Sequence, residues 1–320
     1  MTIPPGSVLA LSGGIGGAKL ALGLSRLIPD ERLIVVANTG DDFEHLGLSI
    51  SPDLDTLLYT LADLNDDVRG WGRKDETWTF MAALKALGGE AWFQLGDGDV
   101  ATHVERTRRL KAGETLSAIM DDFRCRLGIS AQLLPMTEDR VRTRLETAEG
   151  WLDFQDYFVR LQCRPAISAI AFDGADQARP NATLMAALAD PALGGVVICP
   201  SNPFISIEPI LAVPGIRAAI RAAKAPVVAV SPIVGGQAVK GPTGKMMQEL
   251  GLSLTSETVS RRYEGLLDAI LVDAGDTSTS ADHGGAMVVR THTMMTTLDD
   301  KIALAAKVLD VVDAVRRSVR

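Results

Sequence analysis

The chain has 320 residues, 47% of them hydrophobic and 22% charged, which excludes a disordered or collagen-like protein and provides enough apolar surface for a large core. Its net charge of −8 and its few aromatic residues, four Trp, three Tyr and eight Phe, disfavour nucleic-acid binding. Three widely spaced cysteines predict neither disulfides nor a zinc site, and no apolar run approaches the ~20 residues of a membrane helix. Because the first residues also lack a signal-peptide pattern, we expect a cytoplasmic protein without a membrane segment.

Short β-branched runs alternate along the chain with longer amphipathic segments, which is typical of a parallel sheet covered by helices. Several runs are apolar at consecutive positions, as strands are when both faces of a sheet are buried. The predicted strands span residues 8–12, 33–37, 91–95, 167–172, 196–199, 227–230, 269–272 and 287–290. The predicted helices span residues 18–27, 53–64, 77–87, 100–111, 182–189, 217–223, 244–250 and 298–317. The fold class is therefore α/β, with a doubly wound, mostly parallel, Rossmann-like sheet.

The middle of the chain has a different character. From about residue 65 to residue 164 it is more polar, richer in Arg and Asp, and mostly helical by pattern. We interpret 65–164 as an inserted, mainly helical subdomain on a core formed by residues 1–64 and 165–320. The Arg cluster in this segment, at Arg106, Arg108 and Arg109, is interpreted as a solvated helix face.

A glycine-rich segment, SGGIGGAK at 12–19, follows the first predicted strand and opens the first predicted helix. Glycines let the backbone approach a ligand closely, and a helix N-terminus presents free N–H groups to an anion. The spacing matches neither G-x-G-x-x-G nor Walker A, so it predicts a phosphate site of another type, with a ligand-free tight turn as the alternative. The candidate ligand-binding residues are Gly13, Gly14, Gly16, Gly17 and Lys19.

Acidic residues follow the second predicted strand and begin the next helix. Asp41 and Asp42 lie after the strand, and Asp53 and Asp55 lie in the first helical turn behind Ser51 as N-cap. Their loops emerge at the same sheet edge as the glycine-rich turn, and carboxylates opposite a phosphate site are what Mg²⁺ requires. The alternatives are solvated loop acids and charges that complement the helix dipole.

Further polar loops follow other predicted strands. The segment LGDGD at 95–99 lacks the remaining ligands of a calcium loop, and His103 beyond it is interpreted as structural rather than as a base. The loops 200–203 and 231–245 offer N–H groups, hydroxyls and lysines to a diphosphate or a base edge, although both are also ordinary turns. No nucleophile motif is present, which favours phosphoryl-type transfer by positioning and charge neutralisation.

Taken in order, the motifs 12–19, 38–42 (NTGDD), 51–55 (SPDLD), 95–97, 200–203 (PSNP), 231–234 (SPIV) and 241–245 (GPTGK) resemble the 2-phospho-L-lactate transferase family of coenzyme F420 biosynthesis. The resemblance covers nearly the whole chain and depends on the set of motifs. It implies an enzyme that transfers a phosphorylated three-carbon acid from a guanosine diphosphate-linked donor to the ribityl hydroxyl of the deazaflavin FO. GMP is released, Mg²⁺ assists, and a homodimer is implied.

The resemblance also implies roles for individual residues. Asp55, Gln94 and Asp97 are the expected FO contacts, although archaeal-type members carry a basic residue where Gln94 stands and Gly98 replaces a frequent Arg or Lys. Joined with the residue patterns, this gives a mechanistic hypothesis in which Asp55 orients and deprotonates the FO hydroxyl. The guanosine phosphates would be held by the loop 13–19 with Ser201, Asn202 and Lys245, and Mg²⁺ by Asp41, Asp42 or Asp53.

Two other functions are weighed against this one. A non-catalytic nucleotide- or nucleotide-sugar-binding regulator of the same fold would have no use for the motifs at 51–55 and 95–97. A nicotinamide-dependent dehydrogenase would need an intact G-x-G-x-x-G and an acid at the end of the second strand, where Asn38 stands instead. The transferred acid is left open between the phosphoenolpyruvate, 2-phospho-L-lactate and 3-phospho-D-glycerate moieties, because one or two side chains decide between them.

Overall fold

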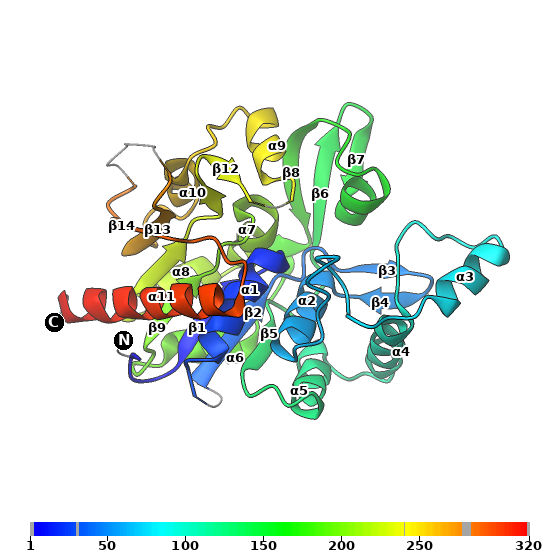
Figure 1. Ribbon diagram of the computed structural model, residues 1–320, viewed down its shortest axis with the longest axis horizontal. Coiled ribbons are helices and arrows are strands. Elements are labelled where there is room, and N and C mark those ends of the chain that lie inside the picture. Colours follow the sequence, from blue (N-terminus) through cyan, green and yellow to red (C-terminus); the bar gives the residue numbers. More distant parts are fainter. Residues whose placement is uncertain (1–2, 30–31, 240, 277–282, 319–320) are drawn as a thin grey trace.

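The structure, a computed structural model, describes residues 3–29, 32–239, 241–276 and 283–318. A seven-stranded sheet of order β14-β13-β10-β9-β1-β2-β5 forms its centre, and every neighbouring pair in it is parallel (Figure 1). This confirms the predicted α/β class. The strands are β1 (Val8–Ser12), β2 (Leu33–Ala37), β5 (Gln132–Pro135), β9 (Gly195–Ile198), β10 (Val227–Val230), β13 (Ala269–Asp273) and β14 (Met287–Thr291).

Helices cover both faces of this sheet, which is why its central strands are apolar at consecutive positions. Val8 and Ala10 of β1 pack into one apolar layer, whereas Leu9 and Leu11 pack into the other. The first layer is covered by α1 (Gly14–Ser25), α2 (Pro52–Leu61), α5 (Leu116–Arg126) and α11 (Leu298–Ser318). The second is covered by α6 (Ala182–Ala189), α7 (Glu208–Ala212), α8 (Ile216–Ala222), α9 (Thr243–Glu249) and α10 (Ser256–Arg262).

The strand order reverses at β1, which lies between β2 and β9. The chain builds the sheet outward from β1 to β2 and β5 on one side, and from β9 to β14 on the other. In open α/β sheets such a reversal leaves a crevice beyond the carboxyl ends of the strands, where ligands bind. The loops that follow β1, β2 and β9 meet at this crevice.

Smaller elements lie beside the main sheet (Figure 1). A hairpin and the helices α3 and α4 extend away from it on the side of β5, and a three-stranded antiparallel sheet of order β7-β6-β8 lies near them. These elements are β3 (Phe43–His45), β4 (Leu48–Ile50), α3 (Thr79–Ala86), α4 (Asp97–Lys111), β6 (Arg142–Thr147), β7 (Gly150–Asp153), the π-helix η2 (Asp156–Arg160) and β8 (Ile167–Asp173). The short remaining elements are η3 (Ala175–Gln177), the π-helix η4 (Pro203–Ile207), β11 (Ile233–Val234) and β12 (Gln237–Ala238).

One strand prediction is wrong. Residues 91–95 form no strand, and Phe93 and Leu95 pack instead into a small cluster with Ile50 and Met81. The predicted strand 167–172 is confirmed as β8, although it pairs antiparallel with β6 and lies outside the main parallel sheet.

The inserted subdomain stays a prediction. The segment 65–164 holds the helices α3, α4, α5 and η2 and also the shorter strands β5, β6 and β7. Because β5 is an edge strand of the main sheet, the segment is in part continuous with the core.

In the described part of the chain no single helix is long and apolar enough to cross a membrane; only one pair, 203–212 with 216–222, bent by 84°, meets the length and composition criteria jointly.

Candidate active site

A cavity of about 640 Å³ opens at the carboxyl edge of the sheet, at the reversal of strand order. Loops that follow β1, β2, β9 and β10 line it, together with the start of α2, parts of α4 and η2, and residues 293–295. It therefore brings together motifs that are nearly 300 residues apart in the chain. The predicted site residues among its lining are Gly13, Gly14, Gly16, Lys19, Asp41, Asp53, Asp55, Gln94, Ser201 and Asn202.

The glycine-rich loop packs directly on the loop after β9. α1 begins at Gly14, which has a φ of +62°, and the N–H of Gly13 donates a hydrogen bond of 3.1 Å to Ser201 Oγ. A Cβ at Gly16 would lie 2.5 Å from the Pro200 carbonyl oxygen, and one at Gly17 would lie 2.4 Å from Ser201 Oγ. Gly16 is thus required by the close approach of a backbone oxygen, whereas a Cβ at Gly17 would meet the side-chain hydroxyls of Ser12 and Ser201. Gly17 lies behind the cavity wall rather than in it.

The polar residues around this loop have defined partners. Lys19 Nζ donates to the Met295 carbonyl at 2.8 Å, which joins α1 to the segment before α11. Asn202 Oδ1 accepts from the first N–H groups of η4, and its Nδ2 donates to Thr243 Oγ1 at 3.0 Å. Lys245 differs from the prediction: its ammonium group donates to the Pro165 carbonyl at 2.8 Å and pairs with Glu249, away from the cavity lining.

Asp41 and Asp53 form a buried pair of carboxylates in the cavity wall. Asp53 accepts hydrogen bonds from the Gly14 N–H at 2.6 Å and from Asn38 Nδ2 at 2.9 Å, so the end of β2 and the start of α1 both hold it. Burial raises the pKa of Asp53 to about 6, and burial together with the Asp53 charge raises the pKa of Asp41 well above its ordinary value. The Oδ1 atom of Asp41 is buried without a hydrogen-bond partner among the described residues.

Asp42, the third predicted metal ligand, does not line the cavity. Ser51 Oγ donates to its Oδ2 at 2.8 Å, and burial raises the pKa of Asp42 to about 7 in spite of the nearby charge of Arg142. Over the described ranges, no three His, Cys, Asp or Glu side chains cluster closely enough to hold a metal by themselves. Two carboxylates suffice for Mg²⁺ when substrate phosphates and water complete its shell, and the Asp41–Asp53 pair fits that requirement.

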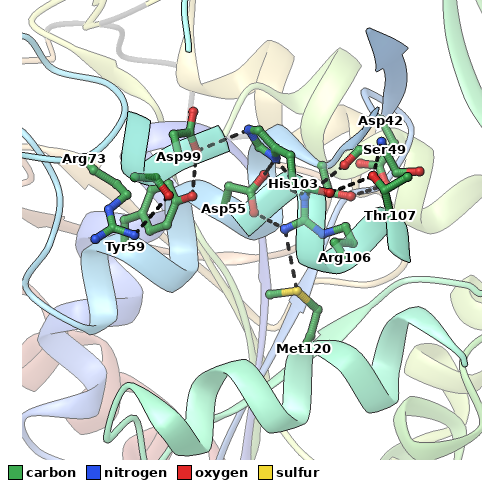
Figure 2. Close-up of polar contacts among 12 residues, drawn as sticks. Asp42, Ser49, Asp55, Tyr59, Arg73, Asp99, His103, Arg106, Thr107 and Met120 are labelled. Atoms are coloured by element: carbon green, nitrogen blue, oxygen red, sulfur yellow. Dashed lines mark hydrogen bonds and ion pairs between the residues drawn. The ribbon is translucent and has the colours of Figure 1, made fainter. Parts of the chain in front are cut away.

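Asp55 follows Asp53 by two residues in the first turn of α2 and contacts a buried arginine. Arg106 of α4 has no exposed surface; its Nη1 donates to Asp55 Oδ2 at 3.1 Å, and its Nη2 bonds Asp55 Oδ1 (Figure 2). The interpretation of Arg106 as part of a solvated face is therefore wrong, whereas Arg108 is exposed and pairs with Glu105. The burial of Arg106 depends on Asp55, which lies 51 residues earlier in the chain, and no local sequence pattern shows this partner.

Three more polar side chains continue this contact along the cavity wall (Figure 2). His103 Nε2 lies 3.2 Å from Asp99 Oδ1, and the hydroxyl of Tyr59 donates to the same oxygen at 2.6 Å. Burial raises the pKa of Asp99, but its contacts with His103 and Tyr59 outweigh burial and lower it. The spacing of Asp99, His103 and Arg106 places them on one face of α4, and this stripe is the sequence signal that could have identified them.

The two other predicted FO contacts differ from each other. Gln94 lines the cavity and is exposed, with its Nε2 donating to the Ala91 carbonyl at 2.6 Å. The Asp97 carboxylate is absent from the lining and accepts hydrogen bonds from Thr77 Oγ1 at 2.6 Å and Phe80 N at 2.9 Å instead. These contacts lower the pKa of Asp97 and give it a structural role at the start of α3.

Aromatic side chains line part of the cavity, a feature that the sequence analysis did not predict. Trp71 and Phe93 come from the segment before α4, and Phe154 and Phe158 come from the region of η2. Phe154 and Phe158 stack with ring centroids 5.3 Å apart, and Trp71 and Phe158 remain 44% and 39% exposed. The cavity thus combines an anion-binding loop, acidic groups and flat apolar surfaces.

Residues 8–312 match the family described as 2-phospho-L-lactate transferase CofD. The chain belongs to this family. A phosphoenolpyruvate transferase from Streptomyces griseus is 41% identical over 317 residues, which cover 97% of this chain and 99% of that protein. One from Mycobacterium tuberculosis (strain ATCC 25177 / H37Ra) is 40% identical over 294 residues, covering 84% and 88%.

Among solved structures, a UPF0052-family protein from Bacillus halodurans has the same fold, with a TM-score of 0.61, 15% identity, and coverage of 96% of this chain and 100% of that one. Membership of the CofD family confirms the resemblance seen in the motifs. As a member, the chain is a transferase of coenzyme F420 biosynthesis.

Proposed function

We propose that this CofD-family protein transfers a phosphoenolpyruvate moiety from a guanosine diphosphate-linked donor to the ribityl hydroxyl of FO and releases GMP. The phosphoenolpyruvate moiety is preferred over the other two acids because the similar Streptomyces and Mycobacterium proteins are named phosphoenolpyruvate transferases. The observation that carries the proposal is that the glycine-rich loop, the Asp41–Asp53 pair and Asp55 lie in one cavity beside exposed aromatic rings.

The donor's phosphates fit the loop between β1 and α1. Backbone N–H groups at the start of a helix stabilise anions, and the loop lies beside Ser201, whose hydroxyl already contacts Gly13. Asp41 and Asp53 are the residues that would hold Mg²⁺, which when bound neutralises charge on the phosphate oxygens. The unpartnered Oδ1 of Asp41 and the mutual repulsion of the two carboxylates favour a cation at this position.

Asp55 is the residue proposed to receive the acceptor. The terminal hydroxyl of FO donates a hydrogen bond to its carboxylate, and the hydroxyl oxygen attacks the phosphorus that carries the acid. One P–O bond forms as the bond to GMP breaks. Arg106 contacts both oxygens of Asp55 and so holds the carboxylate in one orientation. Because the transition state of phosphoryl transfer is loose, we place the proton transfer to Asp55 late, when the attacking oxygen has become acidic. The rings of Trp71 and Phe158 would contact the flat deazaflavin.

Mass spectrometry of reaction mixtures tests the proposal. The purified protein is incubated with FO, Mg²⁺ and each of the three guanylylated acids in turn, and the masses of the products are determined. We expect an FO adduct carrying phosphoenolpyruvate together with GMP, and turnover reduced at least a hundredfold in Asp55→Asn. A protein that binds guanosine nucleotides but neither binds FO nor forms any adduct would be a regulator, and the proposal would be wrong.

A further inference from the structure

Arg106 has a position that the proposed chemistry does not by itself explain. It projects from α4 toward Asp55, and its guanidinium group contacts three other groups besides making a fork with the carboxylate (Figure 2). Nη1 donates to the Ser49 carbonyl at 3.4 Å and lies 3.3 Å from His103 Nδ1, and Nη2 donates to Met120 Sδ at 3.9 Å. The pKa of Arg106 is raised although burial lowers it, because the Asp55 carboxylate supplies negative charge and hydrogen bonds.

The contact with Arg106 determines which nitrogen of His103 carries the proton. A guanidinium group only donates hydrogen bonds, so His103 Nδ1 must accept. The proton of the neutral ring is then on Nε2, which faces Asp99 Oδ1 at 3.2 Å. Arg106 therefore fixes two cavity-lining side chains at once, Asp55 through its fork and His103 through its ring orientation.

We infer that Arg106 is a positioning residue for the acceptor: it holds the Asp55 carboxylate in one orientation and sets the polar wall of His103, Asp99 and Tyr59 against which the hydroxyl-bearing chain of FO lies. This inference rests on the proposed function. The two parallel hydrogen bonds of a guanidinium group fix both oxygens of a carboxylate and therefore its orientation. The ammonium group of a lysine acts as a point charge and does not fix that orientation. Within the described residues, hydrogen bonds join the glycine-rich loop to Ser201 and Asp53, whereas Arg106 bonds Asp55.

A double-mutant cycle between Arg106 and Asp55 tests the inference. Arg106→Lys keeps the charge and removes the fork, so we expect kcat to fall about tenfold or more, corresponding to ~1.4 kcal/mol, with a raised KM for FO. The dissociation constant of GDP, measured by calorimetry, is expected to stay within about twofold. In an Asp55→Asn background the same change should cost clearly less than in the wild type, because the effect through Asp55 is already lost and only the effect through His103 remains. Arg108→Lys, on the exposed part of the same helix, is the matched control and should leave all constants unchanged.

Two substitutions of His103 supply a second test that does not depend on the folding of Arg106→Lys. An Asn side chain offers an acceptor near the position of Nδ1, whereas a Gln side chain reaches the position of Nε2. We expect His103→Asn to retain activity within about threefold and His103→Gln to lose about tenfold. In the protein without substrates, ¹⁵N NMR is expected to show His103 protonated at Nε2.

The outcomes separate the two proposals. Wild-type protein that transfers no acid to FO overturns the proposed function, and with it the role of Arg106. Active wild-type protein with an unchanged Arg106→Lys variant overturns the inference alone. Equal losses in FO and GDP binding would show that Arg106 only maintains the fold and would also overturn it.

Discussion

Glu76 caps α4, the helix that begins at Asp97, and Asp97 caps α3, the helix that follows Glu76. The Glu76 carboxylate accepts hydrogen bonds from Gly98 N at 2.7 Å and Asp99 N at 2.9 Å, in the first turn of α4. Asp97 in turn accepts from Phe80 N at 2.9 Å, in the first turn of α3. The N–H groups at a helix start have no partner within the helix, so each carboxylate stabilises the helix that follows the other. Because α4 carries His103 and Arg106, this reciprocal capping also holds the polar wall of the cavity.

Removal of either cap should lower stability without removing an FO contact. We expect Glu76→Ala to reduce the free energy of unfolding by about 1 kcal/mol, the usual value for a lost cap, and Asp97→Ala to lower Tm as well. The KM for FO should change less than twofold in Asp97→Ala, because this carboxylate is not part of the cavity lining. Urea unfolding and steady-state kinetics measure the two quantities, with Glu149→Ala in an exposed turn as the control. A large rise in KM at unchanged Tm would restore Asp97 as an FO contact.

The main sheet could be predicted from the sequence because its strands are buried on both faces. The runs of β1 and β2 are apolar at nearly every position, and the glycines of the loop after β1 indicate a ligand-binding turn. The strand β6 could not be predicted in this way. Its sequence RTRLET buries only every second side chain, so that Arg142, Arg144 and Glu146 gave the segment the polar character of a solvated helix.

The candidate site was predictable only as far as loop position determines it. Asp41, Asp53 and Asp55 follow parallel strands or begin a helix at the same edge, and the structure brings them into one cavity. The role of Arg106 depends on a contact between α2 and α4, which belongs to tertiary packing. Lys245 was misplaced for the same reason, because the carbonyl of Pro165 and the carboxylate of Glu249 lie nearer to it than the cavity does.

Mg²⁺ should stabilise the protein through Asp41 and Asp53. Two buried carboxylates repel each other, and a cation that binds only the folded state stabilises it by about 2.7 kcal/mol at 100 times its dissociation constant. We expect Mg²⁺, added to protein already saturated with GDP, to raise Tm further in the wild-type protein but not in Asp41→Asn or Asp53→Asn. In the absence of metal, Asp41→Asn should be at least as stable as wild type, because the repulsion is removed. Asp42→Asn is the matched control and should keep the rise in Tm with Mg²⁺. If Asp42→Asn alone lost this rise, the ion would be assigned to Asp42.

Asp42 should make the stability of the protein decrease with rising pH. Its pKa is raised from its ordinary 3.8 to about 7 by burial, so between these values the unfolded chain has released a proton that the folded protein still holds. The contribution of Asp42 to the free energy of unfolding is therefore fully present below pH 3.8 and is lost as the pH rises through 7. Urea unfolding of metal-free protein from pH 4.5 to 8 measures the effect. Asp42→Asn should flatten the slope, and parallel curves for variant and wild type would contradict the burial of this carboxyl group.

Gly16→Ala should separate the two loops that form the proposed phosphate site. The added methyl group would lie 2.5 Å from the Pro200 carbonyl oxygen, and because that oxygen belongs to the backbone, it cannot turn away as a side chain would. The loop after β9 must then move and carry Ser201 with it. The Ser201 hydroxyl and the N–H groups at the start of α1 no longer lie side by side, as they do in the wild-type protein. We expect GDP to bind about tenfold or more weakly and Tm to fall. Gly244→Ala is the control, since its new methyl group would meet neighbours at an ordinary 3.7 Å and alanine favours the helix α9. If calorimetry finds equal GDP affinity in the two variants, the close contact between the loops has no part in binding the nucleotide, and the phosphates must be held elsewhere in the cavity.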